Sequence, residues 1–142
     1  MSSPVPSEVV RRRADIVDAI ALLERALAKP AGDLEPWRTL VSASLTQLAD
    51  LVHDQVIAYE TRVFTDVVEH APRLSGKVGR INELLDTLDG NISTLRADVP
   101  TADPDAVREE ALQVMASIVR GRQMIADVVW EAYTMDLGGQ SA

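Results

Sequence analysis

Apolar residues recur every three or four positions along four long stretches of this chain, and no stretch shows the strict alternation of a strand. This spacing predicts helices over approximately residues 8–29, 34–70, 74–97 and 104–136. The boundaries carry helix-stopping or helix-starting residues: Pro30 and Pro72 close the first two, Pro104 opens the last, and Gly138 follows its end. The chain is therefore expected to be almost entirely helical.

Four amphipathic helices joined by short connections predict an all-α, up-down-up-down four-helix bundle. A length of 142 residues suits one domain over residues 1–142, and an aromatic content of 4% predicts an aliphatic core. The second stretch, at 1.5 Å per residue, would extend about 50 Å, longer than its neighbours can cover. We therefore expect a bend or break in it, at a place that the pattern does not specify.

Composition narrows the classes of partner. A net charge of −8 argues against nucleic acid, because the basic residues gather only at Arg11, Arg12 and Arg13. No run of 18 to 20 apolar residues and no signal peptide is visible, so we expect a cytoplasmic protein without a membrane partner. The chain has no cysteine, which excludes disulfides and thiolate chemistry.

A row of polar residues runs through the apolar face of the second stretch. Its members follow one another at intervals of four and seven residues: Ser42, Thr46, His53 and Glu60. Charged residues also fall on the apolar faces elsewhere, Arg13 and Glu24 in the first stretch and Arg122 in the fourth. Polar groups that face a core need partners, and a buried ion pair roughly offsets its own desolvation cost.

Two interpretations of these inward polar groups remain open. The first is a buried polar network that fixes helix register without a metal, formed by Arg13, Glu24, His53, Glu60 and Arg122. The second is a cation site, although His53 and Glu60 lie two turns apart, about 10 Å, too far for one ion. No Glu-x-x-His pair, phosphate loop or hydrolase motif is present, so we expect no enzyme.

Trp130 and Tyr133 lie three residues apart near the end of the fourth stretch. On a helix they share a face, where two amphipathic aromatics can close a small pocket, form a dimer contact or cap the core. His70, at the end of the second stretch, suits the free carbonyls of a helix C-terminus better than a metal.

Two runs of the chain resemble the hemerythrin-like (HHE cation-binding) family: LVHDQVIAYETRVFTDVVEHAPRL at 51–74 and REEALQVMASIVRGRQMIADVVWEAYTMDLGG at 108–139. The resemblance implies a four-helix bundle with a histidine-rich di-iron centre. Carried over residue by residue, Glu60 matches a family carboxylate, but Val56 stands in its histidine partner's place. Arg122 stands before Asp127 where a histidine is expected, and the first and third stretches contain no histidine.

Three functions follow as expectations. The first is a hemerythrin-like bundle without a complete di-iron site and with no cofactor, acting as an interaction or sensory module with a protein partner or a second copy. The second is a residual cation-binding or redox protein, holding iron through His53, Glu60 and Asp127. The third is a carrier of a small apolar ligand, with a cavity closed by Trp130 and Tyr133.

Overall fold

The computed structural model describes the backbone of residues 7–135 and the side chains of residues 15–134. Within this range the elements follow in the order α1 (Ser7–Ala28), α2 (Leu34–Val52), η1 (His53–Ile57), α3 (Ala58–His70), η2 (Pro72–Leu74), α4 (Ser75–Asp98), α5 (Pro104–Trp130) and η3 (Glu131–Met135). Because α2, η1 and α3 form one continuous rod, these elements make four rods with no strand between residues 7 and 135. The predicted all-α four-helix bundle is confirmed.

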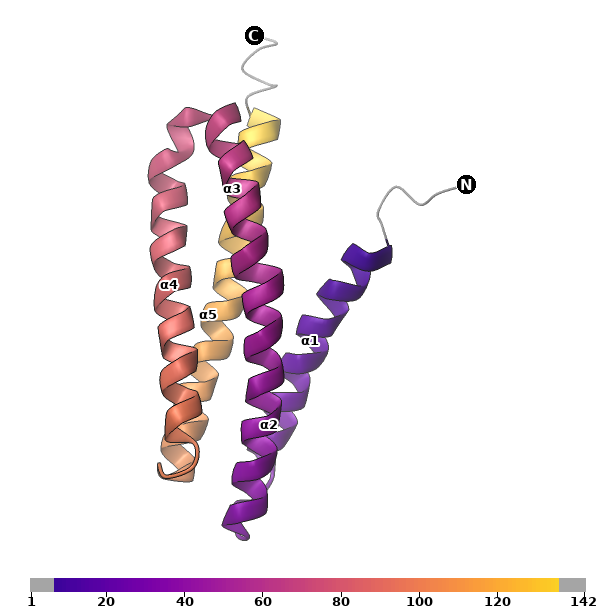
Figure 1. Cartoon of the computed structure of the whole chain (residues 1–142), viewed down its shortest axis with the longest axis vertical. Helices are drawn as coiled ribbons and strands as arrows, with labels where there is room; N and C mark the ends of the chain where they lie inside the picture. The colour runs from indigo at the N-terminus through magenta and orange to yellow at the C-terminus, as the bar shows by residue number, and fades with distance from the viewer. Residues whose placement is uncertain (1–6, 136–142) are drawn as a thin grey trace.

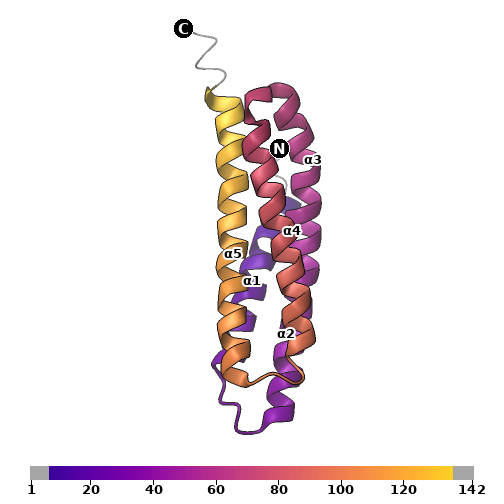
Figure 2. The ribbon, with the colours of Figure 1, turned by 90° about the vertical axis from the view of Figure 1, so that its left-hand side faces the viewer.

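The four rods are not equally close to one another. Figure 1 shows α3, α4 and α5 side by side along the upper part of the molecule. In the lower part, α1 lies against α2, and the N-terminal end of α1 diverges from the other rods. Figure 2 shows the same rods from the side, with α4 in front, α5 beside it and α1 behind them. All four rods therefore lie together only in the lower part of the bundle, and α1 does not cover its upper part. None of the helices in the described range has the length and apolar character needed to cross a membrane.

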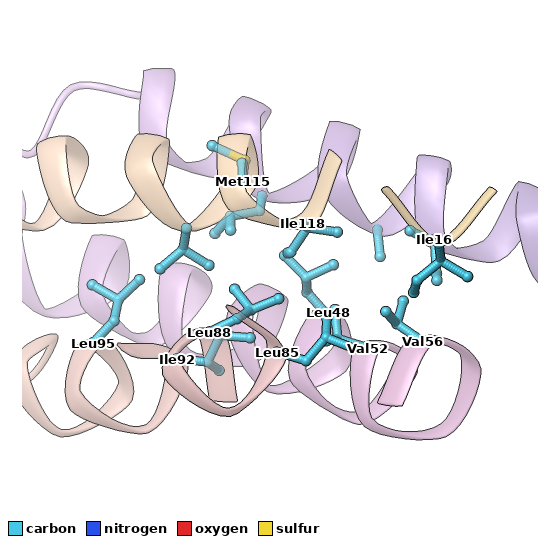
Figure 3. Packing of buried hydrophobic residues seen from close by; sticks show 14 of the residues in the cluster. Ile16, Leu48, Val52, Val56, Leu85, Leu88, Ile92, Leu95, Met115 and Ile118 are labelled. Atoms are coloured by element: carbon cyan, nitrogen blue, oxygen red, sulfur yellow. The ribbon is translucent and has the colours of Figure 1, made fainter. Parts of the chain in front are cut away.

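The core is aliphatic and follows the predicted stripes. In α4 the buried residues are Val78, Ile81, Leu85, Leu88, Ile92 and Leu95, all positions of the stripe seen in the sequence. Figure 3 shows Leu85 and Leu88 directed towards Leu48 and Ile118 from the facing helices. Gly121 lies on the buried face of α5, where an added Cβ would come within 3.3 Å of Leu85 Cδ2. This glycine therefore allows close packing of α4 and α5.

The irregularity expected in the second rod is the π-helical turn η1. A π turn accommodates one extra residue, so the face that points inwards changes by about 100° from one side of it to the other. Before the turn the buried face includes Val41, Leu45, Leu48 and Val52. Val56 is buried within the turn, and Glu60, Phe64 and Val67 are buried after it. Residues that share a face in an ideal helix are thus separated at this turn.

Arg108 of α5 contacts two other helices at the lower end of the bundle. Its Nε and Nη2 donate to the carbonyl oxygens of Leu27 and Lys29 at 2.9 and 3.1 Å, which satisfies acceptors left free at the end of α1. Its guanidinium also lies over the ring of Trp37 in α2, 5.1 Å from the ring centroid. One side chain therefore connects α1, α2 and α5.

Candidate functional site

Glu60 is the buried carboxylate of the bundle, with 5% of its surface exposed. Its Oε1 accepts a hydrogen bond from the Thr61 hydroxyl at 3.0 Å. Its Oε2 is buried and has no hydrogen-bond partner among the described residues. Burial raises the pKa of Glu60 and outweighs the Thr61 hydrogen bond, which lowers this pKa; the negative charge of Asp86 on α4 adds a smaller increase. The surroundings of Glu60 therefore favour its neutral carboxylic acid form over the charged carboxylate.

The predicted buried network does not form around Glu60. Glu24 and His53 have exposed side chains, so the prediction that they face the core is wrong. Glu24 follows the buried Leu23 and therefore falls at the edge of the inward face of α1, and His53 likewise follows Val52. Arg122 is half-buried and makes no ion pair with Glu60 in the described part of the chain. The side chain of Arg13 lies outside the described residues.

The donors proposed for a cation are also separated. Asp127 lies exposed on α5, where its Oδ1 accepts a hydrogen bond from Gln123 Nε2 at 2.8 Å. Among residues 15–134 no three histidine, aspartate or glutamate side chains come together as a metal site would require, so the predicted grouping of His53, Glu60 and Asp127 is wrong. Val56, at the position where the resemblance leads one to expect a histidine, is buried and apolar. This donor set does not fit a di-iron centre.

The first two members of the polar row face a surface hollow instead of the core. Ser42 and Thr46 are half-buried, and with Ser93, Arg96 and Ala97 of α4 they line a hollow of about 370 Å³ between α2 and α4. Because the π turn separates this pair from Glu60, the row has two unrelated halves. The hollow is polar and lies on the outside of the bundle.

Trp130 and Tyr133 have different surroundings although they are three residues apart. The π turn η3 follows Trp130 and carries Tyr133 to the end of α3, where its ring stacks on His70. Trp130 is left 62% exposed. It therefore does not close a cavity, and the predicted pocket between the two aromatics is not formed by their described side chains.

An exposed apolar row on the outer side of α5 was not recognised from the sequence. Leu112 and Val119 are 60% and 57% exposed, comparable with Trp130. Together with two alanines and one glutamine they occupy positions spaced four, three, four, three and four apart, and every member is exposed: Leu112, Ala116, Val119, Gln123, Ala126 and Trp130. We name this set the α5 seam. The sequence does contain a sign of the seam, because its apolar residues recur at helical spacing on the polar side of an amphipathic helix.

The electrostatic surroundings of the α5 seam differ from those of the whole chain. The chain carries a net charge of −8, yet residues 111–126 contain no aspartate or glutamate. Arg120 and Arg122 flank the middle of the seam, and Asp127 is the first carboxylate that follows. The seam is thus an apolar and locally basic strip on an acidic protein.

Comparisons with protein-family models, with curated proteins and with solved structures find no match to this chain.

Proposed function

We propose that this chain is a non-catalytic interaction module whose contact surface is the α5 seam. The observation that carries the proposal is the exposure of Leu112, Val119 and Trp130 on one side of a single helix. Scattered apolar residues are normal on a protein surface, but a row of mainly apolar residues at regular helical spacing is typical of a contact surface. Tryptophan is also among the residues that contribute most to interface energy.

We further propose that the chain is a hemerythrin-like bundle whose metal site has been lost. Its resemblance to that family is supported by Glu60, which is buried in the second rod where the family places a carboxylate. The exposed His53 and the buried Val56 favour loss of the site over retention of a cation. A chain without cysteine is compatible with the reducing cytoplasm, which is where we propose that it acts.

Elemental analysis of untagged protein, purified without chelator from iron-supplemented cells, tests the loss of the metal site. We expect iron far below one atom per chain, unchanged in Glu60→Gln. About two irons per chain, reduced by Glu60→Gln, would contradict the proposal and favour the redox function.

Site-specific photo-crosslinking tests the contact surface itself. Val119 is replaced by a photoreactive phenylalanine derivative in the full chain, in the cells from which it comes, and Glu83 on the exposed side of α4 serves as the control position. We expect an adduct of defined mass from position 119, none from position 83, and loss of the adduct when Trp130→Glu is added. Equal adducts from both positions, or none from either, would show that the α5 seam is not a contact surface.

A further inference from the structure

We infer that the α5 seam binds a second copy of this chain, with the two α5 helices parallel in a short two-stranded coiled coil. This inference rests on the proposed function, because both place the contact at the α5 seam. It goes further by naming the partner, the direction of the helices and the residues that set their register.

The spacing of the seam is that of a heptad repeat. Leu112, Val119 and Ala126 take the d positions, and Ala116, Gln123 and Trp130 take the a positions. The seam covers 18 residue intervals, about 27 Å of helix at 1.5 Å per residue. An ideal helix drifts by about 20° per heptad, so the row stays on one side over this length. It ends at Trp130, because η3 directs Tyr133 towards α3.

Gln123 is the polar residue inside the seam, at a central a position. A single polar a residue in a coiled coil specifies register and favours one arrangement, because any shift leaves it opposite an apolar residue. Its Nε2 already donates to Asp127 Oδ1 at 2.8 Å, which leaves its carbonyl oxygen as an acceptor for Gln123 of the second copy. The seam is thus apolar at both ends and register-specific in the middle.

The charges beside the seam complement each other when the helices are parallel. In that arrangement a g residue lies near the e residue five positions later on the other helix. Arg122 takes a g position and Asp127 the following e position. Two-fold symmetry then forms the Arg122 to Asp127 pair twice, once on each side of the seam.

The antiparallel alternative brings like charges together. The register that places Leu112 against Trp130 of the second copy also places Val119 against Gln123. Around the centre of that pairing, Arg120 would face Arg120 and Arg122 would face Arg122, and these four positive charges would have no carboxylate between them. Charge therefore favours the parallel arrangement.

The position of the seam also limits repulsion between two acidic chains. Each copy carries a net charge of −8, so most pairs of surfaces would repel each other. Residues 111–126 contain no carboxylate, and their two arginines make this part of α5 locally positive. A second copy can approach here at a lower electrostatic cost than at the carboxylate-bearing surfaces.

Sedimentation equilibrium of the full chain tests the stoichiometry. At about 100 μM, well above a micromolar dissociation constant, we expect twice the 15.4 kDa mass of the chain. Val119→Glu should reduce the mass to that of one chain. Gln47→Glu, which adds the same charge at an exposed position of α2, should leave it doubled, with equal helix content in both variants by circular dichroism.

Disulfide trapping tests the direction, and the cysteine-free chain gives a clean background. Ala126→Cys places one thiol in a d layer, where only parallel helices bring the two copies of that residue together. We expect a covalent dimer of Ala126→Cys under mild oxidation and none of Ala106→Cys, an exposed position of α5 away from the seam. If dimers form only when Ala116→Cys and Ala126→Cys are mixed, the helices are antiparallel and the inference is overturned.

The failures of the two proposals differ. A purified wild-type chain that stays monomeric, together with an adduct at position 119 that does not have twice the chain's mass, overturns the second copy but leaves the contact surface in place. A monomeric chain without any adduct at position 119 overturns both.

Discussion

Tyr133 stacks on His70, with their ring centroids 4.7 Å apart and their planes inclined by 29°. The pair joins the end of the fourth rod to the end of the second, at the part of the bundle that α1 does not cover. It also explains why Trp130 and Tyr133, although three residues apart, have different surroundings. Tyr133 contributes to holding the upper end of the bundle together, and Trp130 remains available for contact.

Replacing Tyr133 should weaken this end of the bundle. We expect Tyr133→Ala to lower the free energy of unfolding by about 1 to 2 kcal/mol, the sum of a stacked aromatic pair and partly buried ring surface. Tyr133→Phe keeps the ring and should change it by less than about 0.5 kcal/mol. Urea unfolding followed by circular dichroism measures both. Equal losses in the two variants would mean that the hydroxyl, and not the stacked ring, provides the stability.

The buried Glu60 predicts a pH dependence with a definite sign. Burial raises its pKa, so the folded protein holds this proton more tightly than the unfolded chain does. The resulting stability is fully present below the unfolded pKa and is lost as the pH rises through the folded pKa. Glu60→Gln remains neutral, so its melting temperature should exceed that of the wild type increasingly as the pH rises from about 4 to neutrality.

Glu24→Gln is the matched control for the Glu60 measurement. Glu24 is exposed, so the difference between this variant and the wild type should not change with pH in the same way. A pH-dependent difference as large as that of Glu60→Gln would restore the predicted buried network. Glu60→Gln less stable than the wild type at neutral pH would show that the charged carboxylate has a partner in solution.

The fold could be predicted because apolar spacing depends only on which side of each helix meets the core. The stripe of α4, from Val78 to Leu95, needed no information about its neighbours. Arg108 could not be assigned in the same way. Its bonds to the carbonyls of Leu27 and Lys29 depend on how the end of α1 lies against α5, which no local pattern specifies.

The candidate site was predicted only in part because one π turn changes the phase of the second rod. With a regular helix, Ser42, His53 and Glu60 would share a face; with the extra residue at η1, only Glu60 turns inwards. A sign of the insertion is present in the sequence. The positions that become buried, Val52, Val56, Glu60 and Phe64, are four apart three times in succession, which exceeds the 3.6-residue period.

Glycine positions provide a test of the packing between α4 and α5. Gly90 lies exposed within α4, with nothing within 4 Å of an added Cβ, so Gly90→Ala should stabilise the chain by about 1 kcal/mol. Gly121→Ala gains the same helix propensity but brings its Cβ within 3.3 Å of Leu85 Cδ2. We expect a smaller gain or a net loss, and Gly121→Val should destabilise by about 1 to 3 kcal/mol. Thermal unfolding compares them; equal gains at both alanines would contradict the close packing.

Exchanging the charges of Arg122 and Asp127 tests their predicted pairing between two copies of the chain. Arg122→Asp alone should weaken the dimer, because each added carboxylate then faces Asp127 of the second copy. Adding Asp127→Arg reverses both charges and should restore much of the loss, a coupling of about 1 kcal/mol or about fivefold in the dissociation constant. Sedimentation equilibrium over a concentration series measures it. Independent, additive effects of the two substitutions would contradict the predicted pairing.

The central claim, that the α5 seam is covered by a second copy, is tested most directly by acrylamide quenching of tryptophan fluorescence during dilution. Trp37 is 3% exposed and protected from the quencher, so the quenchable signal comes from Trp130, which is 62% exposed in the single chain. We predict weak quenching at high concentration, stronger quenching on dilution, and strong quenching of Val119→Glu throughout. Strong quenching of the wild type at every concentration would mean that Trp130 stays in solvent, and would contradict the claim.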